Sequence, residues 1–233
     1  EGARYCSMEF TGSGISTLSM DGRFTMANMA VEAGAKNGIM EADAITLSML
    51  SNISLSRKPR IYHSDSDAEW KDVIEVNVAS IEPQVALPHL PENTKSVFSL
   101  PHIAINQSVI GSCTNGRIED LRQAAEVLKN RQVHPGVRLY IFPRTPSILL
   151  QAEREGLVKI FFESGAVLCP PSCGPCLGGH LGVLAEGERC ISTTNRNFVG
   201  RMGHTKSEVY LANPYIAASS AIAGYITTPD QLS

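Results

Sequence analysis

Cys173-Gly174-Pro175-Cys176 is the stretch that organises this chain, and Cys113 stands in an earlier loop that is also rich in glycine. Gly and Pro are the residues that most often mark loops and turns. Three thiols are an informative number, because a closed zinc site uses four ligands and a dithiol redox site uses two. A cluster that leaves one iron open to a substrate uses three. The cysteines therefore indicate a site for metal or thiol chemistry.

Several interpretations of these cysteines compete. Buried free thiols are the usual state of isolated cysteines, but they explain poorly why the cysteines stand in Gly/Pro loops. The Cys-Gly-Pro-Cys motif also matches the redox motif of thioredoxin, which needs a helix that starts within it, and residues 177–180 are a poor helix start. An iron–sulfur site would use Cys113, Cys173 and Cys176 together and leave the other cysteines as packing residues. A thiol-redox or zinc-binding module is the alternative.

Composition limits the classes of function. With 233 residues and 43% hydrophobic content, the chain can bury a real core in one or two domains. Twenty basic and 23 acidic residues leave a net charge of −3 without a basic stripe, so nucleic acid is not an expected partner. No apolar run approaches the ~20 residues of a membrane span. We therefore expect no membrane association.

The location in the cell and the extent of the chain also follow as expectations. The first residues lack a signal-peptide pattern, and the six cysteines are too unevenly spaced for a secreted disulfide framework. These observations predict a cytoplasmic protein. The chain begins without a methionine, which predicts a fragment or a processed piece.

The sequence predicts two lobes. Residues 1–80 are expected to form part of an α/β lobe, with helices over 23–35 and 42–50 and a strand over 72–78. Residues 81–100 contain three prolines in nine residues, a density that excludes a regular helix and predicts a linker. Residues 101–233 are expected to form the second domain.

One polar pair stands out in the first lobe. Asn28 and Glu32 are spaced i, i+4 on the helix predicted over residues 23–35, so they share one face. A stripe exposed to solvent is one interpretation of this pair. The other is an amide and a carboxylate that face a cleft, because the rest of this helix is rich in Met and Ala.

The second lobe alternates strands and helices. Cys113 and the Cys-Gly-Pro-Cys motif both follow predicted strands, and open α/β sheets place their ligands at such strand ends. Cys113 is also expected just before a helix N-terminus, where the helix dipole stabilises anionic sulfur. The predicted strands are residues 105–110, 137–142 and 166–169, and the predicted helices are 117–130, 148–156 and 157–164.

A loop that contains Arg196 and Arg201 supplies a second candidate site. The loop, residues 192–201, is rich in Ser, Thr and Asn. A guanidinium binds a carboxylate through two parallel hydrogen bonds, so two arginines five residues apart are suited to a di- or tricarboxylate. The alternative is a surface loop with two solvated arginines.

Residues 111–115, 173–177 and 195–201, taken in this order, resemble the motifs of the aconitase superfamily. The resemblance runs from about Met8 to the end of the chain and is greatest to the large subunits of 3-isopropylmalate dehydratase and of homoaconitase. It implies aconitase-like α/β/α layers with mostly parallel sheets. It also implies a 4Fe-4S cluster on Cys113, Cys173 and Cys176.

The same resemblance assigns roles to the polar residues. Arg196 and Arg201 match the family's substrate-binding arginines, and Asn195 matches a neighbouring polar ligand. Asn28 and Glu32 match its active-site amide and carboxylate. The substrate would be a small hydroxy acid with two or three carboxylates.

The implied reaction is a dehydration followed by a rehydration that moves the hydroxyl to the adjacent carbon. In leucine biosynthesis it interconverts 2-isopropylmalate and 3-isopropylmalate; a homoaconitase or another dehydratase of this type is the alternative. The family's N-terminal Asp-His motifs have no counterpart here. Its serine base, on a swivelling domain or small subunit, has none either. We therefore expect a small-subunit partner, and a partial active site that does not turn over substrate alone.

Overall fold

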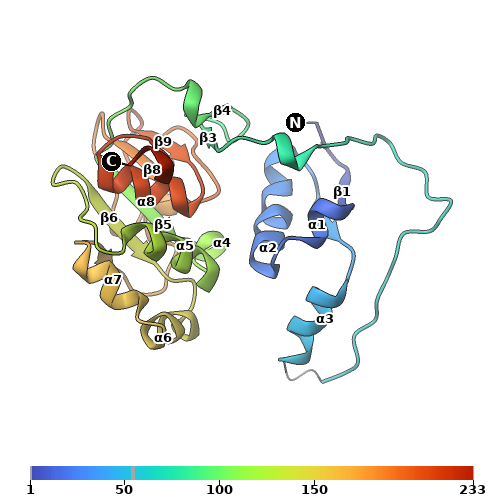
Figure 1. The fold of residues 1–233 in the computed structure, drawn as a ribbon. Helices are drawn as coiled ribbons and strands as arrows, with labels where there is room; N and C mark the ends of the chain where they lie inside the picture. The colour runs from blue at the N-terminus through green and yellow to red at the C-terminus, as the bar shows by residue number, and fades with distance from the viewer. Residues whose placement is uncertain (1, 54–55, 233) are drawn as a thin grey trace. The chain divides into compact units, whose positions relative to one another are not determined.

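The computed structural model of this chain describes residues 2–53 and 56–232, and Figure 1 shows its course. The chain forms two compact units that divide between Ile81 and Glu82. Within the described residues, no helix is both long and apolar enough to cross a bilayer.

A seven-stranded sheet forms the centre of the second unit, in the order β4-β3-β9-β8-β5-β6-β7. The five strands from β9 to β7 run parallel, and β3 and β4 are antiparallel at one edge. This arrangement confirms the predicted α/β class with a mostly parallel sheet. The strands are β3 (Gln84–Ala86), β4 (Thr94–Ser96), β5 (Gln107–Gly111), β6 (Arg138–Phe142), β7 (Val167–Leu168), β8 (Arg189–Ser192) and β9 (Glu208–Leu211).

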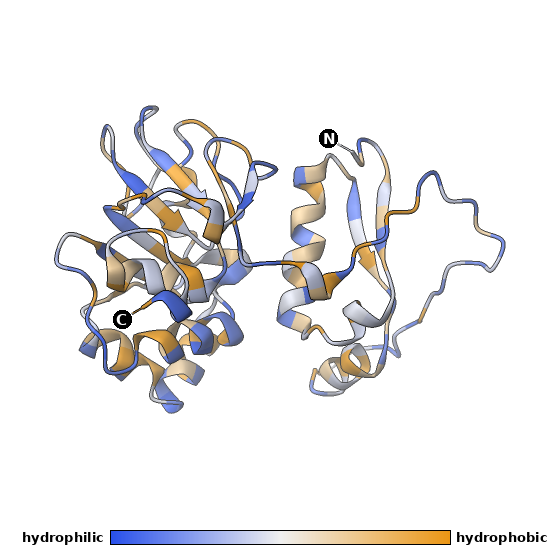
Figure 2. Ribbon diagram, turned by 45° about the horizontal axis from the view of Figure 1, so that its top comes forward, coloured by the Kyte–Doolittle hydropathy of each residue, from blue (hydrophilic) through white to orange (hydrophobic). Residues whose placement is uncertain are grey.

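Helices pack beside this sheet through apolar stripes, and Figure 2 shows apolar and polar residues alternating along them. In α5, Leu121, Ala125 and Leu128 are buried, as their helical spacing predicts. The α-helices are α4 (Ser112–Asn115), α5 (Ile118–Leu128), α6 (Pro146–Arg154), α7 (Leu157–Glu163) and α8 (Pro214–Ala223). Three short 3₁₀ turns are η3 (Val97–Ser99), η4 (Gly174–Leu177) and η5 (Pro229–Gln231).

Two apolar clusters form the core of the second unit. The larger cluster joins residues of α5, α7 and α8 to Ile110, Leu139 and Ile141 of the strands. The smaller cluster includes Val109 and Phe142 and takes Leu184 and Met202 from loops. Adjacent strand residues such as Val109 and Ile110 thus enter different clusters, because side chains alternate across a sheet.

The segment predicted to be a linker, residues 81–100, belongs instead to the second unit from Glu82 onward. Its strands β3 and β4 pair with each other, and β3 also pairs with β9. Pro83 lies before β3, and Pro88 and Pro91 lie in the connection between the two strands. The prolines therefore remove no hydrogen bond from the ladder. The prediction of a linker was wrong because it considered only what prolines exclude.

The first unit contains a two-stranded parallel sheet and short helices. Strand β1 (Ser7–Phe10) pairs with β2 (Asn37–Met40). The helix predicted over residues 23–35 is α2 (Met20–Met29) continued by the 3₁₀ turn η1 (Ala30–Ala33), and it ends at Gly34 in the left-handed conformation (φ 87°). The remaining elements are α1 (Ser13–Ser16), α3 (Ala44–Ser51) and the turn η2 (Val78–Ser80).

A strand over residues 72–78 was predicted, but the structure has none there. Residues 72–77 carry no regular structure, and Val73 and Ile74 are 69% and 79% exposed. An alternating pattern forms a strand only when a neighbouring strand accepts its hydrogen bonds. Within the described part of the first unit, only β1 and β2 are strands, and they pair with each other.

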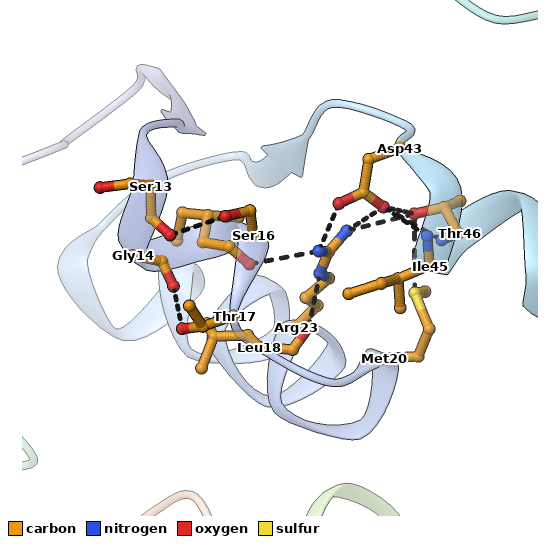
Figure 3. A network of polar contacts seen from close by, with 11 residues as sticks. Ser13, Gly14, Ser16, Thr17, Leu18, Met20, Arg23, Asp43, Ile45 and Thr46 are labelled. Carbon is orange, nitrogen blue, oxygen red and sulfur yellow. Dashed lines mark hydrogen bonds and ion pairs between the residues drawn. The ribbon is translucent and has the colours of Figure 1, made fainter.

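A buried arginine connects the helices of the first unit, as Figure 3 shows. Arg23, on α2, is 3% exposed. It donates to both carboxylate oxygens of Asp43, from Nη1 at 2.8 Å and from Nη2 at 2.6 Å, and to the carbonyl oxygens of Ile15 and Leu18. Asp43 in turn caps α3, because it accepts from the backbone N–H groups of Ile45 and Thr46. Arg23 thus joins α2 to α3 through an ion pair and to α1 through a hydrogen bond to Ile15.

Candidate functional site

Three loops leave the same edge of the sheet in the second unit. Strands β8, β5, β6 and β7 are consecutive parallel neighbours, so their carboxyl ends meet at one edge. Cys113 follows β5, the Cys-Gly-Pro-Cys motif follows β7, and residues 193–201 follow β8. The edge therefore gathers sequence motifs that are as much as 88 residues apart (113 to 201).

The Cys113 loop has a tightly constrained backbone. Gly111 has φ +125°, and a Cβ atom there would lie 2.0 Å from the carbonyl oxygen of Phe142. Ser112 also has a positive φ, 78°. Cys113 itself is exposed and lies within the one-turn helix α4. It was predicted just before the N-terminus of the following helix, but α5 begins only at Ile118. A separate turn intervenes.

The Cys-Gly-Pro-Cys loop turns without starting an α-helix. Cys173 is exposed and precedes the 3₁₀ turn η4, which ends at Gly178 in the left-handed conformation (φ 76°). Gly174 also has a positive φ, and a Cβ atom there would lie 2.8 Å from the ring of Phe142. The helix that a thioredoxin motif requires is absent from this loop, which the structure describes in full.

Phe142 lies between the two cysteine loops and was not identified from the sequence. It ends β6, the strand between β5 and β7, and its side chain is fully buried. Its backbone approaches Gly111, and its ring approaches Gly174. The only signal in the sequence was its position at the end of a predicted strand. Phe142 thus determines how closely the two loops can approach the sheet.

Cys176 contacts residues of the arginine loop. Its thiol is buried and lies 3.9 Å from Oδ1 of Asn195, and Nη2 of Arg201 lies 4.0 Å from its sulfur. Burial raises the pKa of the Cys176 thiol, and the Arg201 guanidinium partly offsets this effect. The sulfurs of Cys113 and Cys173 are near enough to raise the same pKa further through charge repulsion. The structure therefore places Cys113 and Cys173 close enough to Cys176 for their charges to affect its pKa.

The arginine loop is partly buried. Arg201 N donates to the carbonyl oxygen of Phe198 at 2.9 Å, which closes a turn, and Asn195 is 7% exposed. Nε of Arg201 is buried and has no hydrogen-bond partner among the described residues. Asn197, which is fully buried, donates from Nδ2 to the carbonyl oxygen of Leu87 at 2.8 Å. The loop is therefore anchored in the unit, and it is more than a solvated surface segment.

The spacing of the thiols bears on which metal group they suit. Among residues 2–53 and 56–232, no set of three or more His, Cys, Asp or Glu side chains is arranged to hold a single metal ion. Ligands of one zinc ion share a single centre. Cysteines of an iron–sulfur cluster each bind a different iron, so they stand farther apart. Three thiols close enough to affect one another's charge are a donor set of the kind that can hold an iron–sulfur cluster.

Asn28 and Glu32 belong to the first unit, whereas the thiols and arginines belong to the second. Asn28 lies in α2, and Glu32 lies in the turn η1 that continues it. The change from α-helix to 3₁₀ turn between them alters the rotation per residue. The predicted sharing of one regular helix face is therefore only approximate.

Thr193 is a second residue that sequence reasoning missed. It is 1% exposed and immediately follows β8. Its Oγ1 accepts a hydrogen bond from Gly111 N at 2.8 Å, and its carbonyl oxygen accepts one from Nδ2 of Asn115 at 2.6 Å. Nothing in a run of Ser and Thr residues distinguishes this one from its neighbours. Only the fold shows that it joins the arginine loop to the Cys113 loop.

Comparison with known proteins agrees with the family resemblance of the sequence motifs. The model of the family described as "Aconitase family (aconitate hydratase)" matches residues 1–101 and 93–224. Proteins named 3-isopropylmalate dehydratase large subunit from Moorella thermoacetica and Clostridium kluyveri are each 58% identical over 232 residues. One from Caldicellulosiruptor saccharolyticus is 58% identical over 233 residues.

These matches cover all of this chain but only 54–55% of each relative, so the chain spans about half the length of the curated relatives it matches. The family model, in contrast, extends over nearly the whole chain. Its match agrees with the mostly parallel α/β sheet and with the three motifs at one edge of that sheet. This chain therefore belongs to the aconitase family.

Proposed function

We propose that this chain is the cluster-bearing part of a hydro-lyase that interconverts 2-isopropylmalate and 3-isopropylmalate in leucine biosynthesis. The observation that carries the proposal is the meeting of three cysteines and a half-buried arginine, Arg201, at one edge of the sheet. The names of relatives at 58% identity support the choice of substrate. The whole enzyme would include a small subunit, as the name "large subunit" of those relatives suggests.

Cys113, Cys173 and Cys176 would hold a 4Fe-4S cluster. Two of these thiols are exposed and the third is buried, so a group bound to them would be open on one side and enclosed on the other. When bound, the cluster would supply an iron that acts as a Lewis acid toward the substrate hydroxyl. Cys176 is protonated more readily than an ordinary thiol because of its burial. Cluster binding would therefore release a proton from it.

Arg196 and Arg201 would orient the substrate through its carboxylates. Nε of Arg201 is already desolvated without a hydrogen-bond partner in the described structure, so a carboxylate would satisfy a donor that is otherwise costly to bury. Asn195 would add a polar contact beside Cys176. Fixing a dicarboxylate in this way holds the carbon that loses a proton in one orientation.

Asn28 and Glu32 are proposed as catalytic residues of the first unit. An amide can hydrogen-bond to a substrate hydroxyl, and a carboxylate can accept or return a proton as that group leaves or re-enters. The base that removes the proton next to the carboxylate would come from the small subunit. The reaction moves a hydroxyl between adjacent carbons, so it involves no net oxidation or reduction.

A homoaconitase would use the same residues on a longer substrate, and it is the alternative within the family. A thiol-redox module is less favoured, because no α-helix follows the Cys-Gly-Pro-Cys loop. A zinc module is less favoured, because a closed zinc site uses four ligands, whereas this site brings together three thiols.

An activity assay distinguishes these functions. The full-length large subunit would be reconstituted with iron and sulfide without oxygen, combined with its small subunit, and supplied with 2-isopropylmalate, homocitrate or citrate. Formation of the unsaturated intermediate would be followed by ultraviolet absorbance. We expect turnover of 2-isopropylmalate at a kcat/KM at least about 100-fold above the others. Preference for homocitrate would move the assignment to homoaconitase, and turnover of none of the three would overturn the proposal.

A further inference from the structure

Thr193 makes three connections at the point where the Cys113 loop and the arginine loop leave the sheet. Its backbone N donates to the carbonyl oxygen of Val109 at 3.0 Å, which extends the pairing of β8 with β5 by one residue. Its Oγ1 accepts from Gly111 N at 2.8 Å and lies 3.4 Å from the carbonyl oxygen of Gly111, to which it can donate. Its own carbonyl oxygen accepts from Nδ2 of Asn115.

These bonds hold the loop at positions before and after Cys113. Gly111 stands two residues before Cys113 and Asn115 two residues after it. On the other loop, Asn195 and Arg196 follow Thr193 by two and three residues. A residue that is 1% exposed and held by four hydrogen bonds to three other residues has little freedom to move. The position of Cys113 relative to the arginine loop is thus set through one threonine.

We infer that Thr193 is a positioning residue that couples the geometry of the cluster ligand Cys113 to that of the substrate-binding loop. This inference rests on the proposed function, because it assigns Thr193 a role between two parts of that site. Thr193 would touch neither substrate nor cluster. Its hydroxyl would act through Gly111 N, which otherwise would be a buried N–H group without a partner.

A pair of substitutions at Thr193 separates the effect of the hydroxyl from the effect of the side chain's shape. Thr193→Val keeps the volume but removes the bonds of Oγ1 with Gly111, whereas Thr193→Ser keeps them. Thr194→Val is the matched control, because Thr194 is 3% exposed and its Oγ1 accepts from Oγ of Ser192, two residues earlier in the chain. All three would be made in the full-length large subunit, reconstituted and assembled with its small subunit.

The readouts are KM for 2-isopropylmalate and the electron paramagnetic resonance spectrum of the reduced cluster, with and without substrate, both normalised to the cluster content. We expect Thr193→Val to raise KM about tenfold and to shift the cluster's g values. Thr193→Ser should restore both, and Thr194→Val should leave both at wild-type values even if it lowers stability.

Two other results would have different meanings. If the wild-type enzyme assembles no cluster, the proposed function itself fails, and the inference falls with it. If wild-type enzyme is loaded and active but Thr193→Val changes only the melting temperature or the fraction of loaded chains, Thr193 has a merely structural role. The inference is then overturned while the proposed function stands.

Discussion

Nη2 of Arg201 lies 4.0 Å from the sulfur of Cys176. The two residues come from loops that follow different strands, β8 and β7, which are not neighbours in the sheet. The cation lowers the pKa of a thiol that burial otherwise raises. Nε of the same guanidinium is buried without a hydrogen-bond partner in the described residues. Arg201 is thus placed to act on Cys176, the proposed cluster ligand, with one nitrogen and on the carboxylate of the proposed substrate with another.

Replacing Arg201 by Lys should weaken substrate binding more than cluster binding. Lysine keeps the charge near Cys176 but loses the planar pair of donors that holds a carboxylate. We expect KM for 2-isopropylmalate to rise about 10- to 100-fold, with iron per chain close to wild type. Steady-state kinetics of the reconstituted enzyme would measure this effect. Arg189→Lys is the control, because Arg189 is an exposed surface arginine that pairs with Glu208; an equal effect there would contradict the assignment.

The six cysteines should react with an alkylating reagent in an order set by burial. In the chain without a cluster, the exposed Cys113 and Cys173 should be modified first, and Cys176 more slowly. Burial raises the pKa of the Cys190 thiol to about 12, so Cys190 should react only when the second unit unfolds. Mass spectrometry of peptides over time would give the order. Rapid labelling of Cys190 under native conditions would show that the core around β8 is wrongly described.

Gly111→Ala should be severely destabilising. A Cβ atom at Gly111 would lie 2.0 Å from the carbonyl oxygen of Phe142, and φ is +125°. The control is Gly156→Ala, because Gly156 also has a positive φ (77°) but no atom within 4 Å of the added Cβ. We expect the control to cost about 1 kcal/mol in the free energy of unfolding and Gly111→Ala to cost about 3 kcal/mol or more. Similar urea midpoints for the two variants would refute the close approach.

The ion pair of Arg23 and Asp43 should make the first unit sensitive to acid. Hydrogen bonds from Arg23, followed by those from the backbone of Thr46, hold the pKa of the Asp43 carboxyl far below its usual range. The stabilisation is therefore fully present above the unfolded pKa, about 3.9, and is lost as pH falls through the lower folded value.

Hydrogen exchange of peptides from residues 13–51, compared between wild type and Asp43→Asn, tests this acid sensitivity. Because this substitution would leave the buried Arg23 without its counter-charge, protection should fall at neutral pH. The difference from wild type should be constant above about pH 5 and should shrink only in strong acid. Asp67→Asn, in an exposed segment, should change nothing. A difference that grows as pH falls would contradict the sign of this linkage.

Much of the second unit could be predicted from the sequence, because its signals are local. The helical spacing of Leu121, Ala125 and Leu128 predicts the buried face of α5, and apolar runs predict β5 and β6. The three motifs predict a site because parallel strands bring their carboxyl ends together.

The missed features depend on contacts between distant residues. The strands at Thr94–Ser96 and Gln84–Ala86 form because they can pair, although prolines surround them. The apolar alternation around Val73 and Ile74 has no partner strand in the described residues, so it forms none. Thr193 and Phe142 matter through what lies across the sheet from them. No pattern within either segment contains that information.

The central claim is that Cys113, Cys173 and Cys176 together hold one iron–sulfur cluster. The most direct test is to measure iron and acid-labile sulfide after anaerobic reconstitution of the wild type and of the three single Cys→Ser variants, with Cys169→Ser as control. We predict about four irons and four sulfides per chain in the wild type and the control, and loss in each of the three variants. Zinc in place of iron, or no metal together with a Cys173–Cys176 disulfide, would contradict the account.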